Sequence, residues 1–196
     1  PKIQGYLDIL EAKAQRLKHL TEDVVEASKI SSGNITMEYM NINFVEMINQ
    51  TTGEFAEKFE KRNLQIVLNV PEKPVMVRTD GRRMWRVIEN IYNNAAKYAL
   101  EGTRVYADLI EKEHTVEFSL KNISEQPLNI SADELTERFI RGDVSRSTEG
   151  SGLGLSIAKN LTELQGGKFE LYLDGDLFKV TIVFPKAVVG QSVTKS

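Results

Sequence analysis

The sequence contains no cysteine, which excludes disulfides and metal sites that use thiolate ligands. It also lacks a signal-peptide pattern at its start and any run close to the roughly 18 apolar residues of a membrane-spanning helix. The formal net charge is only −3, so no positive excess favours nucleic-acid binding. We therefore expect a soluble, cytoplasmic chain that contacts neither nucleic acid nor a membrane.

The length of 196 residues, of which 41% are hydrophobic, is sufficient for one core and a short appendage. The first residue is Pro1 rather than Met, so we interpret the chain as a fragment of a longer protein. Its patterns divide it into a helical segment at residues 1–33, a domain at residues 34–186 and a flexible tail at residues 187–196.

Residues 3–28 predict one long helix, because they contain no proline and only Gly5 among glycines. Apolar or small residues recur at alternating steps of four and three, the heptad pattern. These residues are Ile3, Leu7, Leu10, Ala14, Leu17, Thr21, Val24 and Ser28. We expect a helix that pairs with a partner helix, and a surface helix docked on its own domain is the alternative. Gly33 stands where a left-handed helix cap is expected.

The remainder alternates between strand and helix patterns without regular βαβ units, which predicts an α/β (α+β) two-layer sandwich with a mixed sheet. Strands are expected at residues 35–40, 64–70, 75–78, 104–110, 116–120, 169–173 and 178–184. Helices are expected at residues 44–62, 80–100 and 153–165, and Asp80 is the expected N-cap of the second of these.

The helix expected at residues 80–100 presents two different faces. Asn90, Asn94, Lys97 and Tyr98 follow at steps of four, three and one, so they share one side. Asparagine oxygens suit Mg²⁺, a lysine suits phosphate, and an aromatic ring can lie against a base. An ordinary polar surface is the alternative. The opposite, apolar stripe consists of Met84, Ile88, Ile91, Ala95 and Ala99.

A glycine-rich cluster precedes the last expected helix, and it reads Gly150-Ser151-Gly152-Leu153-Gly154-Leu155. Glycines let the backbone approach a ligand closely, and the N–H groups at a helix start favour anions such as phosphate. The cluster lacks the lysine of a P-loop and does not follow a strand. Neither the Walker pattern nor the dinucleotide-binding pattern therefore fits.

A polar stretch at residues 121–151 separates these two motifs, with only a short helical pattern near residues 133–139. A segment of that length without its own core is usually a functional lid. Arg141 and Arg146 in this lid are candidates to neutralise charge on a transferred phosphoryl group. A solvated basic loop is the alternative reading, and we prefer it for Arg138.

Three segments resemble, in the same order along the chain, three motifs of bacterial sensor histidine kinases. The helix at Asn90–Tyr98 resembles the N box, and the segment Arg138-Phe139-Ile140-Arg141 resembles the F box. The glycine cluster resembles the second glycine box. These kinases share a superfamily with DNA gyrase and MutL. The resemblance covers residues 44–186, and residues 6–34 resemble the second helix of the family's dimerisation hairpin. It implies the histidine-kinase/gyrase-type ATP-binding fold, preceded by a long helix.

The resemblance also implies roles for individual residues, with ATP and Mg²⁺ as cofactors. Asn94 would hold Mg²⁺, Asn90 would support the metal and phosphate site, Lys97 would reach the phosphates, and Tyr98 would face the adenine. In the lid, Arg141 or Arg146 would approach the γ-phosphate, and Phe139 would belong to the nucleotide site. The backbone of Gly150, Ser151, Gly152, Leu153, Gly154 and Leu155 would wrap the phosphates.

The chain departs from the family where an aspartate usually binds the adenine amino group. Here the corresponding residues are Asn122-Ile123-Ser124-Glu125-Gln126. The side-chain oxygen of Asn122 can accept the same hydrogen bond, but a neutral acceptor makes a weaker bond than a carboxylate.

The phospho-accepting histidine of the family is followed by an acid, and this chain has only His19 and His114. Leu20 follows His19, and His114 lies in a predicted turn. We therefore expect nucleotide binding without autophosphorylation. The partners implied are the missing phospho-accepting helix, a second copy in the full protein and a response regulator. A plasma-membrane anchor is expected in upstream segments.

Two other functions stay open. A gyrase- or MutL-like ATPase activates water and needs a general base, which those proteins place as a glutamate where this chain has Asn90. The adjacent Glu89 lies about 100° around the helix, whereas a kinase with a neutral imidazole acceptor needs no base. A degenerate module acting through protein contacts would explain the altered adenine segment, but not the retained Asn94, Lys97 and Arg141.

Overall fold

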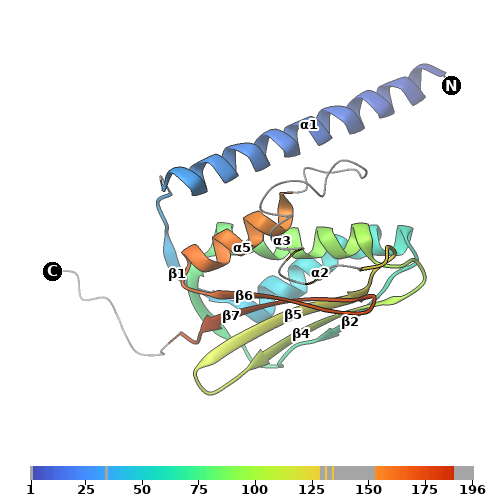
Figure 1. Cartoon of the computed structure of the whole chain (residues 1–196). Helices are drawn as coiled ribbons and strands as arrows, with labels where there is room; N and C mark the ends of the chain where they lie inside the picture. The colour runs from blue at the N-terminus through green and yellow to red at the C-terminus, as the bar shows by residue number, and fades with distance from the viewer. Residues whose placement is uncertain (1, 34, 129–130, 132–133, 135–152, 188–196) are drawn as a thin grey trace.

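The computed structural model of the chain describes residues 2–33, 35–128, 131, 134 and 153–187. It begins with the long helix α1 (Lys2–Ser32), which runs along the outer side of the helical layer (Figure 1). The backbone leaves the helix at Gly33 with φ = 68°, the left-handed conformation expected there. Among the described residues, no helix has both the length and the apolar character needed to cross a membrane.

Five strands form a mixed sheet in the order β2-β4-β5-β7-β6. β2 and β4 are parallel, and the other neighbours are antiparallel. β1 and β3 form a separate two-stranded antiparallel sheet. The strands are β1 (Tyr39–Asn43), β2 (Gln65–Asn69), β3 (Met76–Asp80), β4 (Arg104–Glu111), β5 (Thr115–Ile123), β6 (Lys168–Asp174) and β7 (Leu177–Pro185).

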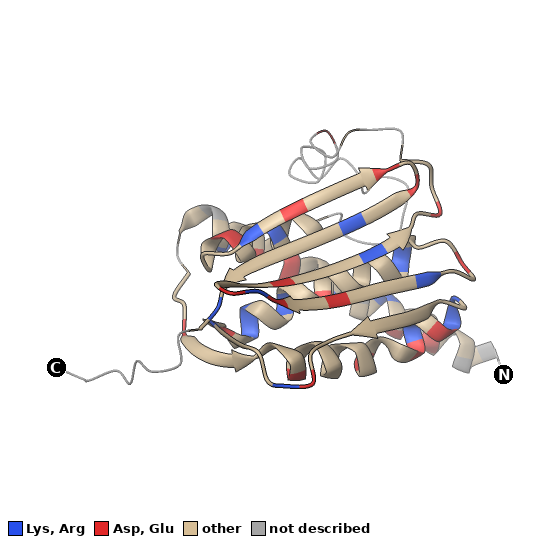
Figure 2. Ribbon diagram, turned by 90° about the horizontal axis from the view of Figure 1, so that it is seen from below, with Lys and Arg blue, Asp and Glu red and all other residues tan. Residues whose placement is uncertain are grey.

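Three helices, α2 (Phe44–Lys61), α3 (Gly81–Tyr98) and α5 (Gly154–Leu164), cover one face of the larger sheet (Figure 1). None of the described helices covers the other face, and acidic and basic residues are interspersed along the strands (Figure 2). The predicted two-layer sandwich with a mixed sheet is therefore confirmed.

The core lies between the sheet and the helices. Alternate residues of the central strands point into it, because successive side chains of a strand face opposite sides. Tyr92 of α3 is fully buried at the centre, and its ring stacks on Phe118 of β5 at 6.3 Å between centroids. Burial raises the pKa of Tyr92 to about 12, although a 2.7 Å hydrogen bond with the Thr52 hydroxyl acts in the opposite direction. The predicted apolar stripe is buried throughout, at Met84, Ile88, Ile91, Ala95 and Ala99.

Some strand boundaries differ from those predicted. The first strand lies at Tyr39–Asn43 rather than residues 35–40, because its pairing with β3 begins at Tyr39. β3 is likewise displaced toward Asp80. The placement of residues 121–123 in the polar stretch was wrong, since β5 continues through them to Ile123 and pairs with β7 up to Leu177.

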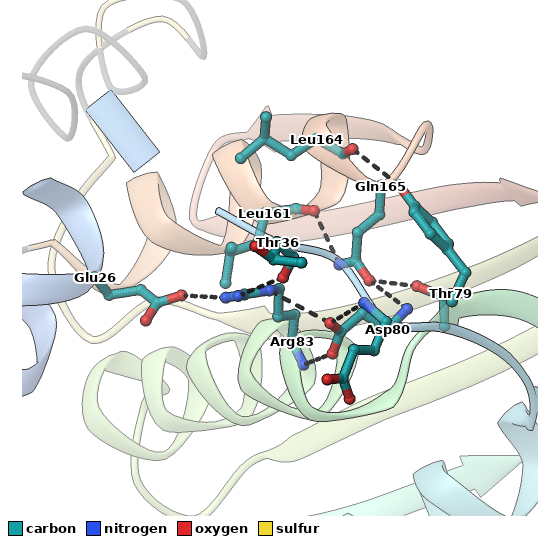
Figure 3. A network of polar contacts seen from close by, with 10 residues as sticks. Glu26, Thr36, Thr79, Asp80, Arg83, Leu161, Leu164 and Gln165 are labelled. Carbon is teal, nitrogen blue, oxygen red and sulfur yellow. Dashed lines mark hydrogen bonds and ion pairs between the residues drawn. The ribbon is translucent and has the colours of Figure 1, made fainter. Parts of the chain in front are cut away.

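Asp80 caps α3 as predicted, and its Oδ1 accepts a 3.1 Å hydrogen bond from the backbone N–H of Arg83. Figure 3 shows how this start of α3 is tied to the end of α5. The Oε1 atom of Gln165 accepts hydrogen bonds from the Thr79 hydroxyl and, at 3.1 Å, from the Asp80 backbone N–H. Its Nε2 donates to the Leu161 carbonyl at 2.9 Å. Gln165 thereby fixes the C-terminal end of α5 against α3.

The C-terminal half of α1 docks on α3 through ion pairs. Arg83 Nη1 lies 3.1 Å from Glu26 Oε1 (Figure 3), and Arg86 Nη2 lies 2.5 Å from Asp23 Oδ1. The alternative of a helix docked on its own domain therefore holds for this half of α1. Pairing with a partner helix stays a prediction, and α1 still exposes apolar side chains. The exposed members of the predicted heptad pattern include Ile3, Leu7, Leu10, Leu17 and Val24.

Candidate functional site

The polar side of α3 carries the predicted site residues on one continuous helix. Asn90 is buried with 8% of its surface exposed, whereas Asn94, Lys97 and Tyr98 are half-buried. The Asn90 Nδ2 atom donates a 2.9 Å hydrogen bond to the Arg86 carbonyl. This bond within the helix orients the Asn90 side-chain amide, so that its Oδ1 atom points away from the Arg86 carbonyl.

The first glycine of α5 lies against the Asn90 amide. A Cβ atom built on Gly154 would stand 3.0 Å from Asn90 Oδ1, closer than side chains normally approach. Glycine is therefore needed for this contact, which joins the motif on α3 to the described end of the glycine cluster. Leu155, the next residue, is buried in the core with 5% exposed, and it anchors the first turn of α5.

The start of α5 has no side-chain cap. Leu153 precedes it, and no side-chain hydrogen bond caps the helix. The Leu153 carbonyl instead accepts hydrogen bonds from Ile157 N–H and the Ser156 hydroxyl, at 2.9 and 2.8 Å. The N–H groups of a first turn have no partner within the helix and carry partial positive charge. An anion bound at this end would satisfy them.

The last turn of α3 carries Lys97 and Tyr98 side by side. The Lys97 Nζ atom lies 4.8 Å from the centre of the Tyr98 ring. One turn earlier, the Asn94 side chain makes no hydrogen bond with any other described residue. An amide, an ammonium and an aromatic ring are thus presented in sequence along the second half of α3.

Asn122 lies at the end of β5, on the face that the helices cover, with 3% of its surface exposed. Its Nδ2 donates a 3.1 Å hydrogen bond to the Ile123 carbonyl, which also accepts one from the Leu100 N–H at 2.8 Å. Among the described residues, Asn122 Oδ1 has no hydrogen-bond donor. Asn122 is therefore held beside the end of α3 with its acceptor oxygen available.

Among the described site residues, Gly154 lies against Asn90. Tyr98 and Asn122 belong to segments that backbone hydrogen bonds join. The remaining predicted site residues lie outside the described part of the chain. They are Phe139, Arg141, Arg146, Gly150, Ser151 and Gly152.

Sequence reasoning missed several residues that support the site. Arg86 provides the carbonyl that orients Asn90 and forms an ion pair with Glu89 at 3.0 Å. Gln165 joins α5 to α3, and Arg62 contacts the last turn of α3. An arginine and acid three apart on a predicted helix is a detectable signal for the Arg86–Glu89 pair. The contacts of Arg62 and Gln165 join distant segments and leave no local pattern.

Hydrogen bonds and positive charges at the start of α3 lower the pKa of Asp80. Burial acts to raise the pKa of Asp80, but the backbone N–H groups of Glu38 and Arg83 and the guanidinium charges of Arg83 and Arg82 outweigh it. The pKa of Asp80 is therefore lowered, and the side chain is a carboxylate at neutral pH. Glu38 N–H donates to Asp80 Oδ2 at 3.0 Å, and Arg83 Nε lies 3.4 Å from the same oxygen.

The described residues contain no cluster of three or more His, Asp or Glu side chains that could hold a metal ion. A divalent ion can nevertheless be held mainly by water and by the oxygens of a bound molecule. Mg²⁺ binds in this manner, since it keeps several waters and takes few protein ligands.

Residues 79–188 match the family model described as Histidine kinase-, DNA gyrase B-, and HSP90-like ATPase. The chain is 27% identical over 196 residues to the sensor histidine kinase GacS of Pseudomonas protegens, covering 95% of this chain and 21% of GacS. It is 31% identical over 176 residues to the sensor protein KdpD of Clostridium acetobutylicum, covering 85% of this chain and 19% of KdpD. The chain therefore spans about a fifth of the length of these relatives.

Solved structures share the fold. Full-length ShkA in complex with AMPPNP superimposes with a TM-score of 0.78 and 19% identity, covering 97% of this chain and 40% of ShkA. Histidine kinase ThkA in complex with response regulator protein TrrA gives a TM-score of 0.70 and 22% identity, covering 94% of this chain and 52% of that one.

Proposed function

Because this chain belongs to the histidine kinase-, DNA gyrase B- and HSP90-like ATPases, as the catalytic domain of a sensor histidine kinase, we propose that it binds Mg-ATP along α3 and transfers the γ-phosphate to a histidine. The contact between Asn90 and the start of α5 carries this proposal. It joins the residue assigned to the metal and phosphates to the start of a helix, where the first N–H groups favour anions.

In this proposal the phosphates lie at the Asn90–Gly154 end of the site. Asn94 supplies an oxygen to Mg²⁺, Asn90 supports the metal and phosphates, and Lys97 reaches toward the phosphate charge. The residues fit this metal, because the Asn94 amide has no described partner to compete for it. Bound Mg²⁺ would neutralise charge on the phosphate oxygens.

The adenine lies at the other end of α3 in this proposal. Tyr98 and Asn122 come from elements that meet there, since Leu100 N–H donates to the Ile123 carbonyl at 2.8 Å. The eight-residue step from Asn90 to Tyr98 corresponds to a rise of about 12 Å along the helix. A nucleotide with its base at one end and its phosphates at the other can span this separation.

The lid completes the proposed site with residues that lie outside the described part of the chain. We assign Arg141 and Arg146 to the charge that develops on the transferred phosphoryl group. Phe139 and the backbone of Gly150, Ser151 and Gly152 belong to the nucleotide-binding set, together with Leu153, Gly154 and Leu155.

Kinase activity is preferred over ATP hydrolysis because, among the described residues, none is placed beside Asn90 to act as a general base. Asn90 is an amide and cannot accept a proton from water. Glu89, the nearest carboxylate in sequence, forms a 3.0 Å ion pair with Arg86. A neutral imidazole attacks phosphorus with its own lone pair, so transfer to histidine requires no base at this position.

The proposal extends to the whole protein. Residues 1–33 would form the second helix of a dimerisation hairpin, and residues 34–186 would form the catalytic domain. The phosphoryl group would pass from a histidine on the first hairpin helix, in a homodimer, to an aspartate of a response regulator. The catalytic domain would be cytoplasmic, and upstream segments would anchor the full protein in the plasma membrane.

Titration calorimetry with ATP, in the presence and absence of Mg²⁺ and with GTP as control, tests this function. We expect Mg²⁺-dependent binding of ATP and weaker binding of GTP. Asn94→Ala should lose Mg-ATP binding while keeping its circular dichroism spectrum. An unchanged affinity in a folded Asn94→Ala variant would refute the metal assignment, and absence of binding at millimolar ATP would refute the nucleotide site.

A further inference from the structure

Arg62, the residue that follows α2, connects the two elements that flank the base end of the site. Its Nη1 atom donates hydrogen bonds to the carbonyls of Ala96, at 3.2 Å, and Lys97. Its Nη2 atom lies 2.8 Å from Glu125 Oε2. One guanidinium therefore contacts both the last turn of α3 and the segment that follows β5.

The backbone reinforces the same junction. Glu125 N–H donates to the Tyr98 carbonyl at 2.8 Å, and Leu100 N–H donates to the Ile123 carbonyl at 2.8 Å. The Asn122 amide donates to that Ile123 carbonyl as well. A short network of hydrogen bonds thus links the two residues assigned to the base, Tyr98 and Asn122. Arg62 adds contacts to both sides of this network, at the end of α3 and at Glu125.

The physical role of this arginine follows from the end of α3. The last carbonyls of a helix have no intrahelical partner and carry partial negative charge, which a cation stabilises. A guanidinium presents several donors in a fixed plane, so it can hold two carbonyls and a carboxylate together. A lysine has no such planar fork.

We propose that Arg62 is a positioning residue that sets the distance between Tyr98 and Asn122 and thereby determines how well the site discriminates adenine from guanine. The proposal rests on the proposed function, because it assumes that the base lies between these two residues. Arg62 touches no nucleotide itself. It acts by holding α3 against β5 before the base arrives, which lowers the ordering cost of binding.

The test compares Arg62→Met with the wild type in calorimetric titrations with Mg-ATP and Mg-GTP. We expect the Mg-ATP affinity to fall roughly tenfold and the ratio of ATP to GTP affinity to fall by about fivefold. The ratio is informative because a partly unfolded population weakens the binding of both nucleotides by the same factor.

Three further variants separate the contacts. Lys61→Met is the matched control, since Lys61 is exposed at the same end of α2 and, in the described part of the chain, pairs with Glu57 alone, at 2.7 Å on the surface. It should behave as the wild type. Arg62→Lys should restore the ratio in part. Glu125→Gln should have an intermediate effect, because Arg62 keeps its two carbonyl contacts.

Amide exchange provides a second measurement that needs no nucleotide. In Arg62→Met the N–H groups of Leu100 and Glu125 should exchange faster, whereas those in the middle of β5 should not change. An unchanged nucleotide ratio together with unchanged exchange at these amides would overturn the positioning role. A wild type that binds neither nucleotide would refute the proposed function itself, and the positioning role with it.

Discussion

Glycine at position 154 lets α5 approach the Asn90 side chain more closely than any other residue would. A Cβ there would stand 3.0 Å from Asn90 Oδ1, and the amide cannot easily turn away, because its nitrogen is bonded to the Arg86 carbonyl. At the scale of single residues, the proposed phosphate end of the site thus depends on glycine at position 154, which has no side chain, and on the fixed orientation of the Asn90 amide.

Gly154→Ala tests this dependence. Alanine favours the helix by about 0.5–1 kcal/mol relative to glycine, so the variant should fold with nearly unchanged thermal stability. The added methyl group should displace Asn90 or the start of α5 and weaken Mg-ATP binding by roughly tenfold. Gly53→Ala is the control, because Gly53 lies on the exposed side of α2 with nothing within 4 Å of a built Cβ. Equal ATP affinities in the two variants would contradict the proposed close approach.

At the scale of elements, the two halves of α1 lie in different surroundings, which its sequence pattern does not show. Its C-terminal half docks on α3 through Asp23 and Glu26. Its N-terminal half carries exposed Ile3, Leu7 and Leu10. The apolar side chains are therefore available to a partner helix while the ion pairs orient α1 relative to the site.

Replacing both acids, as Asp23→Asn with Glu26→Gln, should release α1 without unfolding the domain. Arg83 and Arg86 keep Asp80 and Glu89 as partners, so neither guanidinium is left as an unpaired buried charge and the domain should stay folded. Amide exchange in the C-terminal half of α1 should rise at least about tenfold. Glu22→Gln, a change on the exposed side of α1, is the control.

The same exchange experiment on the wild-type monomer should show protection that decreases from the docked end of α1 toward Ile3. Protection of the whole helix at the level of the sheet, in a strictly monomeric sample, would refute a need for a partner helix.

At the scale of the whole molecule, a buried polar junction joins the two-stranded sheet to three helices. Asp80 caps α3, accepts the Glu38 N–H and pairs with Arg83, which in turn contacts Glu26 of α1. Gln165 brings the end of α5 to the same place (Figure 3). Because the pKa of Asp80 is lowered in the folded state, folding favours its charged form.

Asp80→Asn should therefore change how stability depends on pH. A lowered pKa stabilises the fold above the unfolded value of about 3.9, and this contribution is lost as the pH falls through the folded value. Asparagine keeps the N-cap, so the variant should be less stable than the wild type at pH 7 and approach it at an acid pH below the lowered pKa of Asp80. Denaturant unfolding at both values measures this difference, and a constant difference across the range would contradict the role of the Asp80 charge.

The sequence alone predicted the helix α1 and its end at Gly33, the apolar stripe of α3, the Asp80 cap and the two-layer architecture. These features arise from interactions between residues close in the chain, or from a periodicity that one buried face imposes. It also identified Asn90, Asn94, Lys97 and Tyr98 as one polar side of α3, since neighbours on a helix surface are three or four residues apart.

Only the tertiary structure decided that Asn122 ends a buried strand, that Gly154 lies against Asn90, and that Arg62, Arg83 and Gln165 connect elements distant in sequence. Each of these contacts depends on how the sheet and helices pack, and each joins segments whose separation in the chain carries no periodic signal. Strand ends shifted for the same reason, because pairing with a neighbouring strand, and not local hydrophobicity, determines where β1 begins and where β5 stops.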